Sequence, residues 1–475
     1  MVFSSYVFLL AFLPVVLVFY YLFSLLKNSL WQRLFLVAAS LFFYGYYNVK
    51  YLWLILASIA VNYLLALAIQ RSEGKKSRAF LILGILFNIG LIGYFKYYDF
   101  FISNINSLFR CSFTLRHILL PLGISFFTFQ QLSFLVSVYK KEEMVERLRD
   151  YCLFVTFFPQ LVAGPIVLYS EMIPQFKDEQ RRYFHAENFA AGLFMFALGL
   201  FKKAVIADTL AVFADNGFSM TNLSFSAGWV TSLSYTLQIY FDFSGYSDMA
   251  IGLGRMFNID LPINFLSPYC SESISEYWRR WHITLGRALR TYIYFPLGGS
   301  RKGSFRTCFN LFLTFFISGL WHGAAWTYVL WGSLHGIVVV LERLSREPLE
   351  KIPKRIRIAG TFVLINILFV LFRAESFSQA GEVYRGMLNF GHFGVDQLNT
   401  VAGLIGGINF PNTVDCAYLF VLLAVSLLII FTMPNSVQHL QRFKPSGKTL
   451  PATALLFSVS LLCLSRESVF IYFNF

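Results

Sequence analysis

Residues 311–340 have the sequence LFLTFFISGLWHGAAWTYVLWGSLHGIVVV, and this stretch decides the fold class. It contains no Asp, Glu, Lys or Arg, yet it holds two histidines, His322 and His335. A helix needs about 20 mostly apolar residues to cross the hydrocarbon layer of a bilayer. The stretch therefore predicts helical structure inside a membrane.

Both histidines are candidates for function, because an ionisable group inside a membrane is costly to bury and usually faces a cavity or a partner. His322 follows Trp321 and precedes three small residues, which let a helix or a ligand approach closely. We therefore interpret His322 as functional. For His335, a structural hydrogen bond to a neighbouring helix is at least as well supported. On one continuous helix the two rings would face different sides, which argues against a shared metal site.

The composition agrees with a membrane protein. Of the 475 residues, 57% are hydrophobic and only 13% are charged, against roughly 25% charged in a soluble globular domain. These values exclude disorder, a nucleic-acid-binding tail and an ordinary cytosolic enzyme. The net charge of +14 is the usual sign of cytoplasmic loops enriched in Lys and Arg. No basic stretch has a recognition fold around it, so we expect no nucleic-acid partner.

Apolar segments recur along the chain and predict an all-α polytopic membrane protein. We expect clear spans at residues 3–26, 51–70, 79–98, 187–212, 307–325, 327–341, 357–373, 416–433 and 451–465. Shorter or interrupted segments lie at residues 34–47, 119–138, 151–169 and 226–255. Interrupted segments are tolerated at membrane depth where they pack in protein or line a wet cavity. The sequence thus predicts roughly 11–13 membrane helices, including re-entrant pieces, in one domain over residues 1–475.

Basic loops predict the side of the membrane on which helices end. Residues 71–78, 140–147, 279–306 and 341–355 are rich in Lys and Arg and are expected in the cytoplasm. The N-terminal MVFSSYVFLLAFLPVVLVFYYLF lacks a basic region before its apolar run and a small-residue cleavage site after it. It therefore predicts a retained first span and not a signal peptide. Lys27 and Arg33 after this span agree with a periplasmic or external N-terminus.

A second informative segment runs from Tyr240 to Arg301. Its first part holds Asp242 and Asp248 among aromatic residues and glycines. For both carboxylates a structural role is favoured, either pairing with nearby arginines or capping backbone groups.

Between Ser275 and Arg290, apolar residues recur every four positions, which predicts an amphipathic helix at the membrane interface. Its apolar members are Tyr277, Trp281, Leu285 and Leu289, and its cations are Arg279, Arg280, Arg287 and Arg290. Two interpretations remain open. The helix covers lipid headgroups, or its arginines, with Lys302 and Arg306, face an anionic ligand such as a nucleotide phosphate. The planar fork of Arg suits phosphate because it forms bidentate hydrogen bonds.

Several catalytic motifs are missing from the sequence. There is no G-x-S-x-G, no G-x-x-x-x-G-K-[ST] and no H-E-x-x-H, and GLGRMF (252–257) lacks the third Gly of a dinucleotide fingerprint. His392 and Asp396 are one residue too close for the H-x-x-x-x-D pattern of glycerolipid acyltransferases. The six cysteines have no metal-type spacing, so we expect no metal. These absences argue against a serine hydrolase, an ATP-driven pump, a zinc protease and that acyltransferase class.

A set of longer motifs runs along most of the chain. They are MVFSS at the start, FFPQLVAGPI (157–166), YFDFSGYSDMAIGLGRMF (240–257), NFLSPY (264–269), YWRRWHITLG (277–286), YIYFPLGGSR (292–301), LWHGAAWTYVLWGSLHG (320–336) and FIYFNF (470–475). In these motifs and their order the chain resembles the membrane-bound O-acyltransferase (MBOAT) family. Within that family it resembles the branch of alginate and peptidoglycan O-acetyltransferase membrane subunits.

The resemblance implies a multi-helix fold around a funnel, in which the histidine of the family's WHG motif, here His322, does the chemistry. Neutral imidazole can remove a hydroxyl proton near pH 7, so we assign His322 as the general base. The histidine of the RRWH motif corresponds to His282, which would line the funnel and position or polarise the donor. The expected donor-binding residues are Arg279, Arg280, Trp278, Trp281 and Trp321. The sequence does not separate a phosphate-binding role of the two arginines from a structural one.

The resemblance also implies an activity. We expect a multi-pass protein of the bacterial inner membrane that takes acetyl from a cytoplasmic thioester, with acetyl-CoA as donor and no bound cofactor. The acetyl group would cross the bilayer for O-acetylation of peptidoglycan or of an exopolysaccharide such as alginate. The expected partner is a separate periplasmic, esterase-like O-acetyltransferase of the SGNH type. The alternatives are D-alanyl transfer to teichoic acid, which the long segment from Glu375 to Pro411 disfavours, and polysaccharide or lipid transport, which the lack of paired halves disfavours.

Three positions need separate treatment. Thr291 and Ser137 stand where family members often have Asp, so no role of those carboxylates is transferred. Tyr472 in the terminal FIYFNF matches a tyrosine thought to receive the acyl group in related systems. A hydrophobic tail that anchors the last helix end is an equally supported interpretation of that motif.

Overall fold

In the computed structural model the chain folds almost entirely into helices. The structure describes residues 1–394, 396–403 and 412–464, and these residues contain no strand. The chain forms two compact units, which are treated separately below. Unit 1 comprises Met1–Phe196, Ser247–Pro262 and Lys444–Leu450, and unit 2 comprises Ala197–Tyr246, Ile263–Phe443 and Pro451–Phe475.

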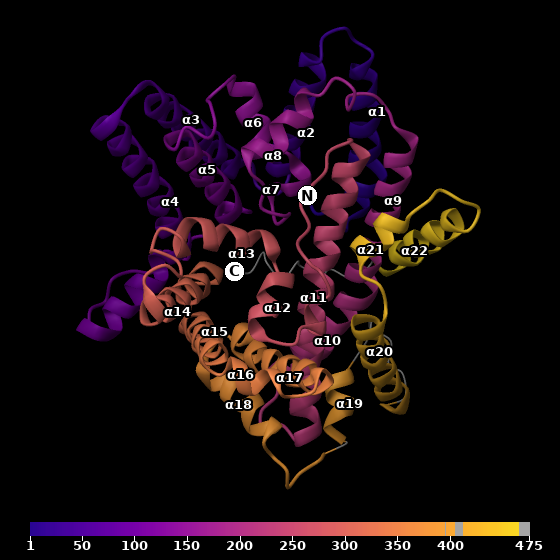
Figure 1. Ribbon diagram of the computed structural model, residues 1–475. Coiled ribbons are helices and arrows are strands. Elements are labelled where there is room, and N and C mark those ends of the chain that lie inside the picture. The colour runs from indigo at the N-terminus through magenta and orange to yellow at the C-terminus, as the bar shows by residue number, and fades with distance from the viewer. Residues whose placement is uncertain (395, 404–411, 465–475) are drawn as a thin grey trace. The chain divides into compact units, whose positions relative to one another are not determined.

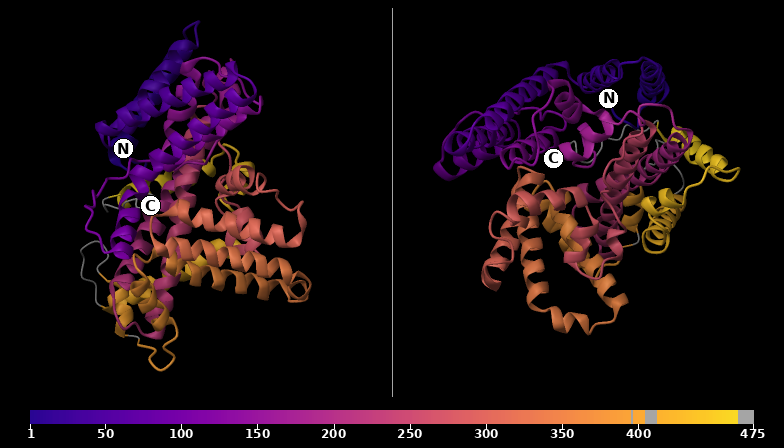
Figure 2. Two further views of the ribbon diagram at one scale, coloured as in Figure 1. Left: turned by 90° about the vertical axis from the view of Figure 1, so that its left-hand side faces the viewer. Right: turned by 45° about the horizontal axis from the view of Figure 1, so that its top comes forward.

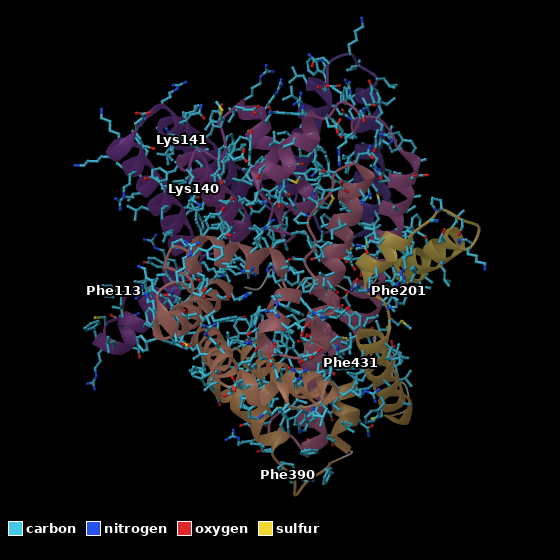
Figure 3. All side chains as sticks on the ribbon, viewed as in Figure 1. Phe113, Lys140, Lys141, Phe201, Phe390 and Phe431 are labelled. Atoms are coloured by element: carbon cyan, nitrogen blue, oxygen red, sulfur yellow. The ribbon has the colours of Figure 1, made fainter. Side chains whose placement is uncertain are left out.

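Unit 1 contains the N-terminal helices. They are η1 (Phe8–Phe12), α1 (Leu13–Ser24), α2 (Leu30–Gly45), α3 (Val49–Arg71), α4 (Gly74–Phe109), α5 (Ile124–Tyr139), α6 (Leu148–Thr156), α7 (Phe158–Leu161), α8 (Tyr169–Lys177) and the first part of α9 (Ala186–Phe201). The helices α3, α4 and α5 pack against one another (Figure 1). Between α3 and α4 the buried amides of Asn62 and Asn88 exchange hydrogen bonds of 2.6 and 3.3 Å. Lys140 and Lys141 follow α5 directly and are exposed (Figure 3), as expected for a basic loop.

Unit 2 contains the remaining helices. After the end of α9 come η2 (Lys202–Ala207), α10 (Asp208–Ser219), α11 (Phe225–Met256), η3 (Pro268–Cys270), α12 (Ile274–Arg280), α13 (Ile283–Leu289), η4 (Arg290–Tyr294), α14 (Gly303–His322), α15 (Trp326–Leu344), α16 (Arg346–Glu350), α17 (Lys354–Arg373), α18 (Phe377–Met387), α19 (Asp396–Ala402), α20 (Asn412–Thr432), α21 (Ser436–Arg442) and most of α22 (Thr449–Cys463). The last residues of α11 belong to unit 1.

Each expected span coincides with helical structure, which confirms an all-α, multi-pass protein. Within the described residues, four helices are long and apolar enough to cross a membrane, or five if the bent pair α20 and α21 forms one span. The four are Val49–Arg71, Gly74–Phe109, Ala186–Ser219 and Lys354–Arg373. The bent pair turns by 59° at its break.

One segment expected to be interrupted is continuous. Residues 226–255 lie within the unbroken 32-residue helix α11. Its glycines permit close packing instead of ending the helix. In unit 1, a Cβ atom on Gly252 would lie 2.6 Å from the carbonyl oxygen of Gly192, so only glycine allows α9 and α11 to approach this closely there.

Candidate active site

The first part of the site is the hairpin of α14 and α15 (Figure 2). Its two helices are separated by a short turn after His322, the last residue of α14. A Cβ on Gly319 would lie 2.4 Å from the carbonyl oxygen of Tyr328, and a Cβ on Gly332 would lie 2.5 Å from that of Phe315. The glycines therefore bring the two backbones into contact and fix where His322 sits.

The His322 side chain is only 3% exposed and is surrounded by aromatic rings. Its ring centroid lies 5.1 Å from Trp321, 5.2 Å from Trp331 on α15 and 5.2 Å from Phe372 on α17. The edge-to-face geometry of these pairs is favourable for aromatic packing. Residues from three helices thus hold the imidazole in one place away from bulk water.

His335 lies on the other side of Trp331, with ring centroids 4.7 Å apart. The indole N–H of Trp278 on α12 donates a 3.2 Å hydrogen bond to Nδ1 of His335. This is the bond to a neighbouring helix that a structural histidine was expected to make. Within the described residues, no group of three or more His, Cys, Asp or Glu side chains is arranged to hold a metal ion.

The prediction of one amphipathic helix over residues 275–290 is wrong. The helix breaks into α12 and α13 at His282, whose φ of 44° is in the left-handed region. At the break, the backbone of the NFLSPY segment takes the hydrogen bonds that a continuous helix would make. The N–H of Leu266 donates to the carbonyl of Arg280, and the N–H of Ile283 donates to the carbonyl of Asn264, both at 3.0 Å.

The apolar side of the two short helices faces protein and not lipid. Tyr277, Trp281 and Leu285 are each at most 2% exposed. The rings of Tyr277 and Trp281 stack with centroids 5.5 Å apart. Trp281, expected at the donor site, is therefore part of the core of unit 2.

The segment from α12 to α13 runs alongside α15. It starts beside the C-terminal end of α15, where the N–H of Ser275 donates to Glu342 at 3.1 Å. Three residues later, Trp278 packs against Trp331 with centroids 5.7 Å apart. Because Glu342 and Trp331 are eleven residues apart, the two points of α15 that α12 contacts are separated by about 16 Å along the axis of α15.

This path carries His282 to the end of α14. The His282 ring centroid lies 6.3 Å from that of Trp321, and Trp321 lies 5.1 Å from His322. The two histidines, forty residues apart in sequence, therefore flank one indole ring. The sequence prediction that they act at one site is compatible with this arrangement.

His282 is 1% exposed and has a polar and an apolar neighbour that sequence reasoning did not single out. Its Nδ1 lies 3.2 Å from Oδ1 of Asn264, and its ring meets that of Phe243 on α11 edge-on at 4.7 Å. Asn264 is the first residue of the NFLSPY motif, so the motif pointed to this segment. Sequence spacing could not show that the Asn264 side chain contacts His282.

The two neighbouring arginines of α12 have different surroundings. Arg280 forms a 2.6 Å ion pair with Glu276, one turn earlier. Arg279 is exposed, and the described part of the chain provides no ion pair for it. Instead, Arg279 lines a cavity of about 1100 Å³ between α12, α15, α16 and α17.

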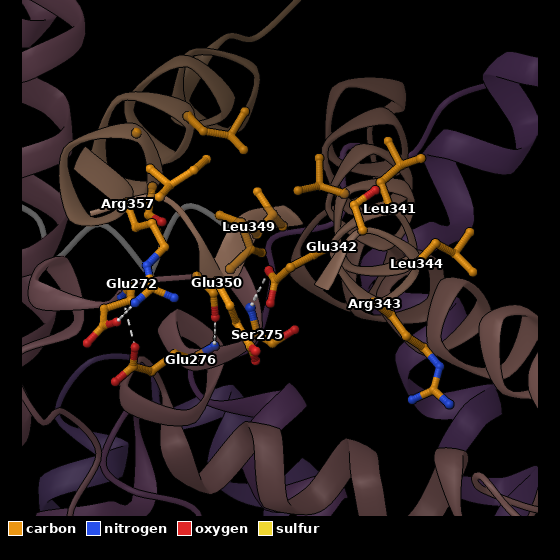
Figure 4. A pocket seen from close by; sticks show the side chains of 18 of the residues that line it. Glu272, Ser275, Glu276, Leu341, Glu342, Arg343, Leu344, Leu349, Glu350 and Arg357 are labelled. Atoms are coloured by element: carbon orange, nitrogen blue, oxygen red, sulfur yellow. Dashed lines mark hydrogen bonds and ion pairs between the residues drawn. The ribbon is translucent and has the colours of Figure 1, made fainter. Parts of the chain in front are cut away.

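Figure 4 shows this cavity, which combines charged and apolar walls. Its apolar side includes Leu341, Leu344 and Leu349. Glu272 forms ion pairs with Lys354 at 2.9 Å and with Arg357 at 2.6 Å. The hydrogen bond from Lys354 lowers the pKa of the Glu272 carboxyl. At neutral pH this carboxylate is therefore ionised and paired with two cations.

Asp242 is paired with a lysine and not with an arginine. The Lys203 ammonium lies 2.8 Å from Asp242 and 2.7 Å from Asp208, and all three side chains are at most 7% exposed. Asp248 is also buried. Asp242 is therefore paired, as expected, but its partner is Lys203 and not an arginine. Tyr472 lies outside the described residues.

Comparison with known proteins identifies the family of this chain. Residues 147–377 match the model of the membrane-bound O-acyltransferase family. The chain is 43% identical to the peptidoglycan O-acetyltransferase of Helicobacter pylori, over 100% of this chain and 98% of that protein. It is 38% identical to the probable alginate O-acetylase AlgI of Pseudomonas putida, over the full length of both.

Teichoic acid D-alanyltransferase is a more distant relative. The Bacillus subtilis protein is 28% identical over 46% of this chain and 58% of its own length. The two full-length relatives carry acetyl-transfer names. The chain belongs to the membrane-bound O-acyltransferase family and is an O-acyltransferase.

Proposed function

We propose that this enzyme moves acetyl from acetyl-CoA at the cytoplasmic face of the bacterial inner membrane to an acceptor on the other side. The observation that carries the proposal is the meeting of two buried histidines at Trp321, one at the end of α14 and one between α12 and α13. A path that starts beside the basic residues 341–355 and ends at two buried histidines suits a donor that enters from the cytoplasm.

His322 acts as the general base in this proposal. It removes the proton of the acceptor hydroxyl as the hydroxyl oxygen attacks the thioester carbonyl. The C–S bond then breaks, and the departing thiolate takes the proton from the imidazolium. The products are an acetyl ester and free thiol, so the histidine returns to its neutral form.

The donor is proposed to enter through the cavity beside α12. Arg279 provides a guanidinium without an ion pair among the described residues, and such a group can bind a phosphate of the donor bidentately. Arg280 is held by Glu276 and serves α12 itself. The acyl arm would extend along α12 toward His282, whose position at the end of that helix places it near the thioester.

The acceptor is proposed to be a cell-wall or secreted polysaccharide. The full-length relatives are named for peptidoglycan and for alginate, and both polymers lie outside the cytoplasmic membrane. Transfer to a polymer also requires a protein that holds the sugar chain. We propose a separate periplasmic, esterase-like O-acetyltransferase of the SGNH type in that role, with Tyr472 as an acyl relay between the two.

The test is mass analysis of O-acetyl groups on peptidoglycan and secreted glycans from a deletion strain. The strain is complemented with wild type, with His322→Ala, or with His185→Ala, a control at an exposed histidine. We expect wild type and His185→Ala to restore acetylation and His322→Ala to leave it absent. Equal acetylation in the deletion strain and all complemented strains would refute the proposal. Purified enzyme with radiolabelled acetyl-CoA then tests the donor.

A further inference from the structure

The His282 ring is held by an amide that the proposed chemistry does not yet use. Asn264 is 1% exposed. Its Oδ1 lies 3.2 Å from Nδ1 of His282, 3.2 Å from the backbone nitrogen of Thr284 and 2.9 Å from Oγ1 of Thr284. One oxygen atom therefore faces three potential donors.

The backbone contact fixes which way the Asn264 amide points. A backbone N–H can only donate, so the atom of Asn264 that faces Thr284 must be the carbonyl oxygen and not the NH₂ group. A carbonyl oxygen can only accept. His282 therefore makes the same contact by donating from Nδ1, and the neutral ring then carries its lone pair on Nε2.

The local backbone holds this contact from both sides. The carbonyl of Asn264 accepts the N–H of Ile283, and the left-handed φ of 44° at His282 aims the ring toward the amide. A non-glycine residue in that conformation is strained. The Nδ2 atom of Asn264 is buried with no hydrogen-bond partner among the described residues, which adds a further cost.

An apolar side chain at position 264 would avoid the buried NH₂ group. The asparagine is instead explained by what its oxygen does for the histidine. The benzyl ring of Phe243 from α11, which packs edge-on against His282, has no hydrogen-bonding group that could select between the tautomers.

We propose that Asn264 is a positioning residue that holds His282 as the Nδ1–H tautomer, so that Nε2 accepts a hydrogen bond or proton from a substrate N–H or O–H group. This inference rests on the proposed role of His282 and sharpens it. A ring with its lone pair on Nε2 cannot donate a hydrogen bond from that atom to a carbonyl. His282 therefore positions the donor by accepting and does not polarise the thioester by donating.

The direct test is nitrogen NMR of the full-length protein in lipid bilayers with ¹⁵N-labelled histidine. The signals of His282 are assigned by their loss in His282→Gln. We expect a protonated Nδ1 and an unprotonated Nε2 in wild type, and a mixture of tautomers in Asn264→Ala. A protonated Nε2 in wild type overturns the inference. The spectrum decides this whether or not acetyl-CoA is the donor, so failure of the proposed function is seen separately.

Kinetics of the same variants separate positioning from a merely structural role. Asn264→Ala is expected to lower kcat by about ten- to a hundredfold and to raise the KM for the donor, because a proton on Nε2 removes the hydrogen bond that positions the donor. Asn264→Asp keeps the accepting oxygen and is expected to retain more activity. Its carboxylate favours the imidazolium, so the acidic limb of its pH profile moves up by about one pH unit.

The matched control is Asn366→Ala. Asn366 is also buried, and its Oδ1 accepts a 2.7 Å hydrogen bond from Thr236, with no bond to a histidine. We expect this variant to lower the yield of folded protein while its pH profile matches wild type. Equal kcat losses in the two alanine variants, with an unshifted profile for Asn264→Asp, would mean that Asn264 is only structural.

Discussion

Arg279 and Arg280 are adjacent in sequence, but the rotation of about 100° between consecutive helical residues gives them different neighbours. Arg280 meets Glu276 at 2.6 Å, whereas Arg279 faces the cavity beside α12. The four-residue spacing of the apolar residues assigns both arginines to the polar side of one amphipathic helix. It cannot show that only Arg280 has an acidic partner on that helix. The ion pair of Arg280 is about one third exposed and is worth only about 0.3–0.5 kcal/mol.

Substitution of each arginine should therefore give a different result. For Arg279→Ala we expect the KM for acetyl-CoA to rise about tenfold, the loss of one charge-assisted hydrogen bond, with an unchanged melting temperature. For Arg280→Ala we expect a small loss of stability and an unchanged KM. Radiolabel transfer by purified enzyme and thermal unfolding in detergent measure both quantities. An unchanged KM for Arg279→Ala would instead favour a contact with lipid headgroups.

At the scale of elements, the hairpin of α14 and α15 depends on glycines where the backbones touch. A Cβ on Gly332 would meet the carbonyl oxygen of Phe315 at 2.5 Å and the Cα of Gly319 at 2.8 Å. Neither atom can move without shifting a helix. In α17, a Cβ on Gly360 would meet nothing within 4 Å.

Alanine at these two positions is thus expected to have opposite effects. Gly332→Ala should destabilise the protein by about 1–3 kcal/mol through overpacking and should lower activity, because the hairpin positions His322. Gly360→Ala should be neutral or stabilising by up to about 1 kcal/mol, since Ala is the better helix former. Thermal unfolding and glycan acetylation are the measurements. A Gly332→Ala enzyme as stable and active as wild type would show that the hairpin tolerates separation.

The elements also show what sequence could and could not provide. The apolar stretches predicted the long helices, because apolarity and length are properties of each segment alone. The four-residue spacing between Ser275 and Arg290 predicted one helix, but the backbone of residues 264–266 competes for its hydrogen bonds and breaks it at His282. Spacing cannot detect a partner that lies outside the segment. For the same reason it missed Asn264 and the ring of Phe372.

At the scale of the whole molecule, the basic loops predict a topology that the helix order can test. If residues 71–78 are cytoplasmic, α4 leads outward and Cys111, which is exposed, lies outside. Residues 341–355 are expected inside. A membrane-impermeant maleimide should label Cys111 in intact spheroplasts.

The expected cytoplasmic position of residues 341–355 is tested with Lys351→Cys in a Cys111→Ser background. Lys351 is exposed, so its cysteine should react only after the membrane is permeabilised. Labelling of position 351 from outside would reverse the assigned topology and the proposed direction of transfer with it. The remaining cysteines are at least partly buried and provide the background level.

The packing of the segment from α12 to α13 against α15 has a consequence for how the enzyme is made. The arginines of this segment make it a poor candidate for insertion into lipid on its own, because each charge at membrane depth costs at least about 2.5 kcal/mol. The partners that hold α12, His335 and Glu342 on α15, are synthesised later than α12 itself. The ribosome must therefore pass residue 342 before the segment can dock. We expect His282 to reach its place only after the α14 and α15 hairpin has left the translocon, so the active site assembles late in biogenesis.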